Sequence, residues 1–216
     1  MSARVPLRLM PLGGSVTKGV GSSHGTGYRK ALLELLQAQN FEVCMVGSRR
    51  TGSMPNNDHE GWRGNRIDEI TNKAMKSVGR LMPNLLTVNA GSNDCIQAFR
   101  VDQAGERMNN LLEYIWHVSP NSTVLLSTLL VNSDKQVNER VMHVNDRFRT
   151  LAEQKATLQR RIVLVDLYND GPRVESLVDG IHPNDQGYDT LAMLWFNGIQ
   201  RALQKGLVVG PNGTGV

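Results

Sequence analysis

The chain has 216 residues, of which 40% are hydrophobic and 20% charged, and its formal net charge is +4. This apolar content excludes intrinsic disorder, and no run approaches the ~18 consecutive apolar residues of a membrane-spanning helix, so we expect no membrane partner. The basic residues are scattered, with the pairs Arg49-Arg50 and Arg160-Arg161 as their densest clusters, so we expect a solvated surface and no nucleic-acid partner.

Short apolar runs alternate with amphipathic stretches along most of the chain. In chain order, the pattern predicts a strand at 8–12, a helix at 28–39, a strand at 41–46, a helix at 65–77, a strand at 84–89, a helix at 103–118, a strand at 122–127, a helix at 135–158, a strand at 162–167 and a helix at 186–205. Such alternation is typical of a parallel sheet with helices on both faces. No linker or repeat divides the chain, so we predict one domain over residues 1–206 and a flexible tail at 207–216.

The cysteine count and the N-terminus bear on the compartment. Cys44 and Cys95 are too few for a disulfide framework, and both lie in or beside apolar runs, where cysteine is usually a small buried side chain. The N-terminus lacks the apolar segment of ~7–15 residues of a signal peptide, which indicates an intracellular protein if the sequence is read literally. The glycosylation acceptors Asn121 and Asn212 keep secretion open, should a leader precede this sequence.

Four segments carry side chains of the types used in catalysis, and each segment is expected to be a loop. They are Gly13–Thr17, His59–Asn65, Gly91–Asp94 and Asp179–Pro183. Taken singly, each has an ordinary explanation as a turn or a helix cap. Loops at the carboxyl ends of parallel strands share one edge of the sheet, however, so we expect these segments to meet there. Together they supply a hydroxyl, an imidazole with a nearby carboxylate, an amide and a glycine N–H, which are the groups that acyl transfer requires.

Each group has a physical role in that reaction. A serine hydroxyl is a weak nucleophile, so Ser15 needs a base, and we predict His182 in this role. Asp179, three residues earlier, is expected to orient the imidazole and stabilise its positive charge. The backbone N–H groups of Ser15 and Gly64 and the side-chain amide of Asn93 are expected to form the oxyanion hole.

These blocks resemble the SGNH hydrolases, also called GDSL esterases, whose marker residues are Ser, Gly, Asn and His. The matching residues, in the family's order over about residues 7–200, are Ser15 in LGGSVTKG, Gly64 in HEGWRGNRIDEI, Asn93 in AGSND and His182 in DGIHPN. The resemblance implies a flavodoxin-like three-layer α/β/α sandwich around a central five-stranded parallel sheet, a Ser–His–Asp triad and no metal or other cofactor. The HEGWRG segment looks most like the small carbohydrate acetyl esterases, such as acetylxylan esterases. One departure is Gly14, where the family usually has an Asp that helps hold the nucleophile loop.

Other motifs do not fit the sequence. GxxxxGK[ST] is absent, G-x-S-x-G does not occur around Ser15, and the five histidines show no HxxxH or HxH pair for zinc. We therefore expect a serine esterase that removes acetyl groups from a carbohydrate, without a metal. Two alternatives stay open: a lipolytic esterase or thioesterase with the same triad, and a non-catalytic carbohydrate-binding relative. The sequence leaves the oligomeric state open.

Overall fold

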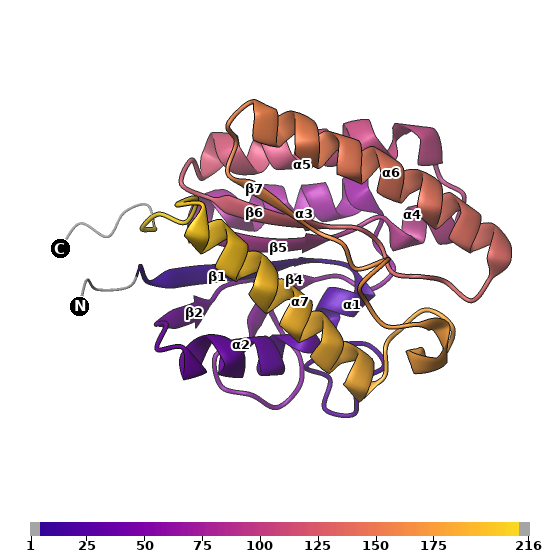
Figure 1. Cartoon of the computed structure of the whole chain (residues 1–216), viewed down its shortest axis with the longest axis horizontal. Helices are drawn as coiled ribbons and strands as arrows, with labels where there is room; N and C mark the ends of the chain where they lie inside the picture. Colours follow the sequence, from indigo (N-terminus) through magenta and orange to yellow (C-terminus); the bar gives the residue numbers. More distant parts are fainter. Residues whose placement is uncertain (1–4, 212–216) are drawn as a thin grey trace.

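The five predicted strands lie side by side in one parallel sheet (Figure 1). The structure, a computed structural model, describes residues 5–211, so the acceptor Asn212 lies outside the described residues. The strands follow the order β2-β1-β5-β6-β7, where β1 is Leu7–Gly13, β2 is Val43–Met45, β5 is Leu85–Asn89, β6 is Thr123–Ser127 and β7 is Ile162–Val165. The predicted five-stranded parallel core is confirmed.

Two further short strands extend the sheet where a loop was expected. β4 (Asp58–Gly61) runs parallel to the carboxyl-terminal end of β1, with Gly13 opposite Gly61, and β3 (Arg49–Arg50) pairs antiparallel with β4. The prediction of a loop at 59–61 was therefore wrong. The sequence of β4, DHEG, is polar, and hydrophobic periodicity does not detect such a strand.

Helices cover both faces of the sheet, as predicted. α2 (Tyr28–Ala38) and α7 (Asp185–Gln204) pack together on one face. α3 (Ile67–Leu81), α5 (Ala104–Val118) and α6 (Lys135–Thr157) cover the other face (Figure 1). The short elements α1 (Ser15–Lys18), α4 (Ser92–Ile96), η1 (Val101–Gln103) and η2 (Val174–Ser176) were not predicted. The predictions of loops at 15–17 and 92–94 were wrong, because α1 and α4 begin there.

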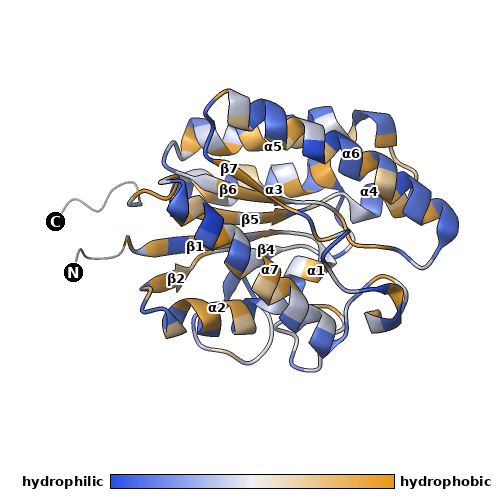
Figure 2. Ribbon diagram, viewed as in Figure 1, coloured by the Kyte–Doolittle hydropathy of each residue, from blue (hydrophilic) through white to orange (hydrophobic). Residues whose placement is uncertain are grey.

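Successive side chains of the central strands point to opposite faces of the sheet, and this divides the buried core into two clusters. In β5 and β6, Leu86, Val88, Val124 and Leu126 point to the side of α3, α5 and α6, whereas Leu85 and Leu125 point to the side of α2 and α7. Each such side chain contributes about 1.5–3 kcal/mol when fully buried. Figure 2 shows the result as apolar strands between helices whose outer surfaces are largely polar. This rigid sheet fixes the positions of the loops at its carboxyl edge.

Two expectations about exposure need correction. Cys95 is buried as predicted, but Cys44 is exposed, because it lies on the outward face of the short strand β2. Residues 207–210 lie against the sheet instead of extending freely: Val208 is buried, and the backbone oxygens of Leu207 and Val209 accept hydrogen bonds from Thr123 and Asn84. Residues 212–216 of the predicted tail lie outside the described residues. None of the helices within residues 5–211 is long and apolar enough to cross a membrane.

Candidate active site

The site lies where the sheet changes its direction of winding. β1 and β5 are neighbours, but the chain leaves β1 toward β2 and leaves β5 toward β6. Loops that leave two adjacent parallel strands in opposite directions open a crevice between them. Gly13 brings the two strand ends close together: a Cβ at this position would lie 2.1 Å from the backbone oxygen of Asn89, so only glycine fits.

The structure brings Ser15, His182 and Asp179 into one hydrogen-bonded chain. Ser15 Oγ lies 2.8 Å from Nε2 of His182, although the two residues are 167 positions apart in the sequence. His182 Nδ1 lies 2.7 Å from Oδ2 of Asp179. An ionised carboxylate only accepts, so Nδ1 carries the hydrogen and Nε2 is free to accept from the serine hydroxyl.

A tight hairpin holds the imidazole and the carboxylate together. Val178 N donates to the backbone oxygen of His182 at 2.8 Å, and Asp179 Oδ1 accepts from the backbone N of His182 at 2.8 Å. Partial burial raises the pKa of Asp179, but the hydrogen bonds from the side chain and backbone of His182 outweigh burial, so the pKa lies below its ordinary value. Asp179 is therefore ionised at neutral pH. Directly after the hairpin, Asn184 caps α7 by accepting from Gly187 N.

Two of the three residues expected to supply oxyanion donors, Ser15 and Asn93, line a small cavity. The cavity has a volume of about 10 Å³ and is lined by Gly14, Ser15, Val16, Asn65 and residues 89–93. Asn93 Nδ2 donates one hydrogen to Asn65 O at 3.0 Å, which fixes the plane of the amide and leaves its second hydrogen available. The backbone N–H groups of Ser15 and Gly64 donate to no other residue of the described chain.

Gly64 lies beside this cavity without lining it, on a loop that β4 positions. Trp62 N, next to the end of β4, donates to Gly13 O at 2.8 Å, which joins this loop to the nucleophile loop. Gly64 has a φ of +83°, a left-handed conformation that side chains with a Cβ rarely adopt. The loop then enters α3, whose Ile67 N donates to the Asp94 carboxylate.

Arg29 is part of the site's support, and the sequence analysis did not identify it. This guanidinium is fully buried in α2 and donates to the backbone oxygens of Thr17 and Lys18 at 3.1 Å each. It also donates to backbone or side-chain oxygens of Gly25, Thr51 and Asn57. Burial lowers the pKa of Arg29 to about 10, so it stays charged at neutral pH. The sequence does indicate that Arg29 is buried, because it falls on the same face of the helix as Leu32, Leu33 and Leu36.

Gly14, where the resemblance implies an Asp, leaves open space. A Cβ at this position would lie 3.8 Å from Asn93 Nδ2, with no closer neighbour. The nucleophile loop is held by backbone bonds instead: Gly14 N donates to Asn89 O, and Gly14 O accepts from Lys18 N. Together with Arg29, these bonds fix the loop without a carboxylate at position 14.

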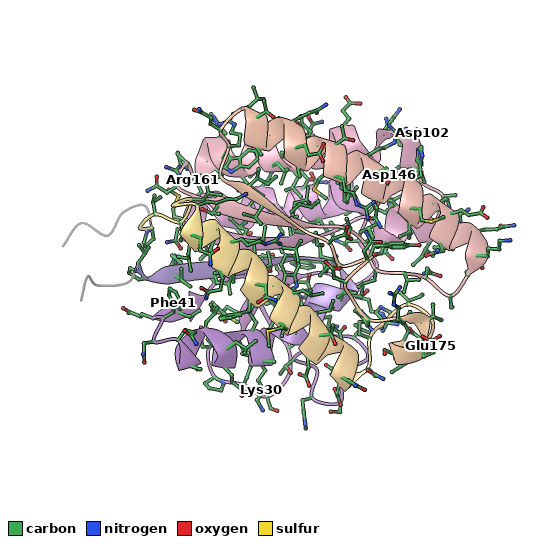
Figure 3. All side chains as sticks on the ribbon, viewed as in Figure 1. Lys30, Phe41, Asp102, Asp146, Arg161 and Glu175 are labelled. Atoms are coloured by element: carbon green, nitrogen blue, oxygen red, sulfur yellow. The ribbon has the colours of Figure 1, made fainter. Side chains whose placement is uncertain are left out.

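A surface pocket between α5 and α6 contains none of the predicted site residues. This pocket has a volume of about 710 Å³, and its lining includes the charged side chains of Asp102 and Asp146. Figure 3 shows these two residues on the side of α6, away from Glu175. Within the described range, no three His, Cys, Asp or Glu side chains gather closely enough to hold a metal ion.

Comparison with known proteins assigns the chain to a family. Residues 12–190 match the GDSL-like Lipase/Acylhydrolase family. A multidomain esterase of Ruminococcus flavefaciens is 25% identical over 94% of this chain, which spans only 30% of that protein's length.

Solved structures share the fold. A family 3 carbohydrate esterase of Clostridium thermocellum superimposes with a TM-score of 0.83, at 24% identity over 94% of this chain and 100% of that one. A family 3 carbohydrate esterase from Talaromyces cellulolyticus gives 0.80, at 22% identity over 92% and 99% of the two chains. A variant of an acetyl-xylooligosaccharide esterase from Geobacillus Stearmophilus gives 0.72, at 18% identity over 92% and 96%. The flavodoxin-like three-layer sandwich is therefore confirmed, and the chain belongs to the GDSL-like lipase/acylhydrolase family.

Proposed function

We propose that this esterase removes acetyl groups from a carbohydrate through a Ser15–His182–Asp179 triad. The observation that carries the proposal is the continuous contact from Ser15 Oγ through His182 to Asp179, with distances of 2.8 and 2.7 Å. The hydroxyl, the base and the orienting carboxylate are in the order that nucleophilic acyl transfer requires.

In the proposed reaction, Ser15 Oγ attacks the carbonyl carbon of the ester while His182 Nε2 takes the hydroxyl proton. The tetrahedral oxyanion accepts hydrogen bonds from Ser15 N, Gly64 N and Asn93 Nδ2. When the intermediate collapses, the sugar oxygen leaves with the proton from His182, and the acetyl group stays on Ser15. Water then attacks this acyl-enzyme, His182 takes a proton from it, and acetate leaves as Ser15 Oγ regains the proton.

The size of the cavity beside Ser15 supports a short acyl group. Its volume of about 10 Å³ is on the scale of a single water molecule, so this space suits only a small group. A chain of eight carbons has no place in this cavity. The acetyl-xylooligosaccharide esterase with the same fold supports a sugar as the alcohol part of the substrate.

Replacing the nucleophile tests the mechanism. The Ser15→Ala variant is expected to lose at least about 10⁴-fold of kcat on p-nitrophenyl acetate, because it lacks the attacking oxygen. Ser53→Ala, at an exposed serine with no hydrogen-bond partner among the described side chains, is the matched control and should retain full activity. Activity of Ser15→Ala within tenfold of the parent would reject the mechanism.

Two further measurements separate the alternatives. Faster hydrolysis of esters with eight or more acyl carbons would favour a lipolytic enzyme or thioesterase. Sugar binding by the parent, without covalent labelling of Ser15 by a fluorophosphonate, would favour a non-catalytic binding protein.

A further inference from the structure

We propose that a second pocket, beside the triad hairpin, binds a neutral sugar unit that neighbours the acetylated unit of the substrate. This inference rests on the proposed function and names the part of the substrate that lies beyond the ester. The pocket, here called the 168–175 pocket, has a volume of about 240 Å³ and is lined by Val131, Tyr168, Arg173, Val174 and Glu175.

The walls of the 168–175 pocket continue directly into the hairpin that carries Asp179 and His182. One wall belongs to the segment after β6, where Ser133 N donates to Gly180 O at 2.9 Å, next to Asp179. The other wall belongs to the segment after β7, where Ser176 O accepts from Asn184 N just beyond the hairpin. Figure 3 shows Glu175 at the end of the molecule that also holds α1 and the loops of the active site. A substrate unit in the pocket would therefore extend from a chain bound at Ser15.

Tyr168 lines the pocket with an aromatic ring that is partly exposed. Cations lie over two other aromatic rings: Arg49 and Lys73 are each 4.2 Å from the centre of Trp62, and Arg66 is 4.1 Å from the centre of Phe99. The ring of Tyr168 has no aromatic or cationic partner within residues 5–211 and packs in part against the core. The apolar C–H face of a pyranose can pack on such a ring, while the hydroxyls at the ring's rim reach polar groups.

The polar groups of the pocket match the hydroxyls of a neutral sugar. Tyr168 Oη accepts from Asn138 Nδ2 at 3.0 Å, and its own hydrogen has no acceptor among the described residues. The side chains of Arg173 and Glu175 are exposed and form neither ion pairs nor hydrogen bonds within the described chain. The pocket thus offers donors on Tyr168 and Arg173 and an acceptor on Glu175, and the two charges cancel. This balance favours a neutral hydroxylated ligand over an acidic one.

The test compares two substrates with and without Arg173. The ratio of kcat/KM for an acetylated xylo-oligosaccharide to kcat/KM for p-nitrophenyl acetate is expected to fall about tenfold in Arg173→Ala, mainly through a higher KM, because hydrogen bonds from a charged group to the neighbouring sugar unit are lost. Tyr168→Phe keeps the ring and removes the hydroxyl, and a smaller fall in the same ratio is expected. Arg80→Ala, at an exposed and unpaired arginine in the last turn of α3, is the matched control and should leave the ratio unchanged. An unchanged ratio in Arg173→Ala would overturn the proposal.

A binding measurement keeps this test separate from that of the proposed function. Unacetylated xylo-, manno- and cello-oligosaccharides are titrated calorimetrically into the full chain carrying Ser15→Ala, alone and combined with Arg173→Ala. Binding of at least one of them that weakens about tenfold on loss of Arg173 supports the pocket, even if the parent hydrolyses neither ester and the proposed function fails. Absence of binding by all three, or binding that is independent of Arg173, overturns the pocket, even if Ser15 proves to be the nucleophile.

Discussion

The amide of Asn93 has two N–H groups, and contacts within the protein account for one of them. Nδ2 donates to Asn65 O at 3.0 Å, so the oxygen of a neighbouring loop sets the orientation of the amide before a substrate arrives. A donor that is already oriented stabilises a developing oxyanion without reorganisation during the reaction. The contact also joins the loop of Gly64 to α4, so the donors on the two segments move together.

Removing this amide should slow the chemical step more than it weakens substrate binding. In Asn93→Ala, kcat on p-nitrophenyl acetate is expected to fall about 10²–10³-fold with little change in KM, because the donor acts on the oxyanion of the transition state. Asn72→Ala, at an exposed position of α3, is the matched control. A rise in KM with an unchanged kcat would assign Asn93 to ground-state binding.

α5 reaches the active site through one buried side chain, Arg107. Its Nη1 donates to Asp94 Oδ1 at 2.5 Å, and its Nη2 donates to the backbone oxygens of Phe99 and Arg100. The other carboxylate oxygen of Asp94 accepts from Ile67 N at the start of α3. Burial raises the pKa of Asp94, while the charge and hydrogen bond of Arg107 oppose that rise. This pair therefore connects α3, α4 and α5 directly behind Asn93.

Removing either Asp94 or Arg107 should lower the free energy of unfolding, because the charge of the other residue is then left buried and unpaired. Asp94 is fully buried and Arg107 is 7% exposed, so Arg107→Met is expected to lower the free energy of unfolding by about 3–5 kcal/mol. The double variant Asp94→Asn/Arg107→Met removes both charges and should recover part of that loss in a double-mutant cycle. Urea unfolding measures both effects. A loss below about 1 kcal/mol in Arg107→Met would show that the pair is not a structural link.

Periodicity predicted the long elements of this fold well and the short ones poorly. Helices such as α6 bury a continuous stripe, which the sequence displays as Val137, Val141, Val144 and Phe148. β4 has no such stripe, because its place is set by pairing with β1 from a distant part of the chain. The marker residues could be identified from their motifs, but their distances could not, since 167 positions separate Ser15 from His182. Arg29 and Arg107 were not predicted, although each lies on the apolar face of its helix. An arginine at such a position indicates a buried cation that binds backbone oxygens of neighbouring loops.

At the scale of the whole molecule, a buried histidine links stability to pH. His59 in β4 is fully buried: its Nδ1 accepts from Gly61 N at 2.9 Å, and its Nε2 lies 3.1 Å from Thr51 Oγ1. Burial, together with the nearby charges of Arg29, Arg49 and Lys18, lowers the pKa of His59 to about 3. The imidazole is therefore neutral in the folded protein at any pH above that value. A proton on Nδ1 would remove the acceptor of Gly61 N, close to the loop of Gly64.

The sign of the effect follows from the two states. An unfolded histidine titrates near ~6.5, so between pH 6.5 and 3 the unfolded chain binds a proton that the folded chain does not, and stability falls as the pH falls. At pH 4.5, the two-unit difference from ~6.5 corresponds to about 2–3 kcal/mol. Carboxyl groups with lowered pKa values, such as those of Asp179 and Asp166, also stabilise the folded protein. Their contribution to stability is lost mainly at lower pH, because the pKa of a carboxyl group in the unfolded chain is near ~4.

Comparison of His59→Gln with the parent isolates this contribution. Glutamine keeps a polar side chain but cannot take up a proton. Between pH 7 and pH 4.5, the free energy of unfolding measured in urea should therefore fall by about 2–3 kcal/mol less in the variant than in the parent. His117→Gln, at an exposed histidine in the last turn of α5, should lose as much as the parent. Equal losses in all three proteins would mean that His59 takes up its proton without unfolding. In that case the β4 segment must open locally in acid, and esterase activity should fall before the global unfolding transition begins.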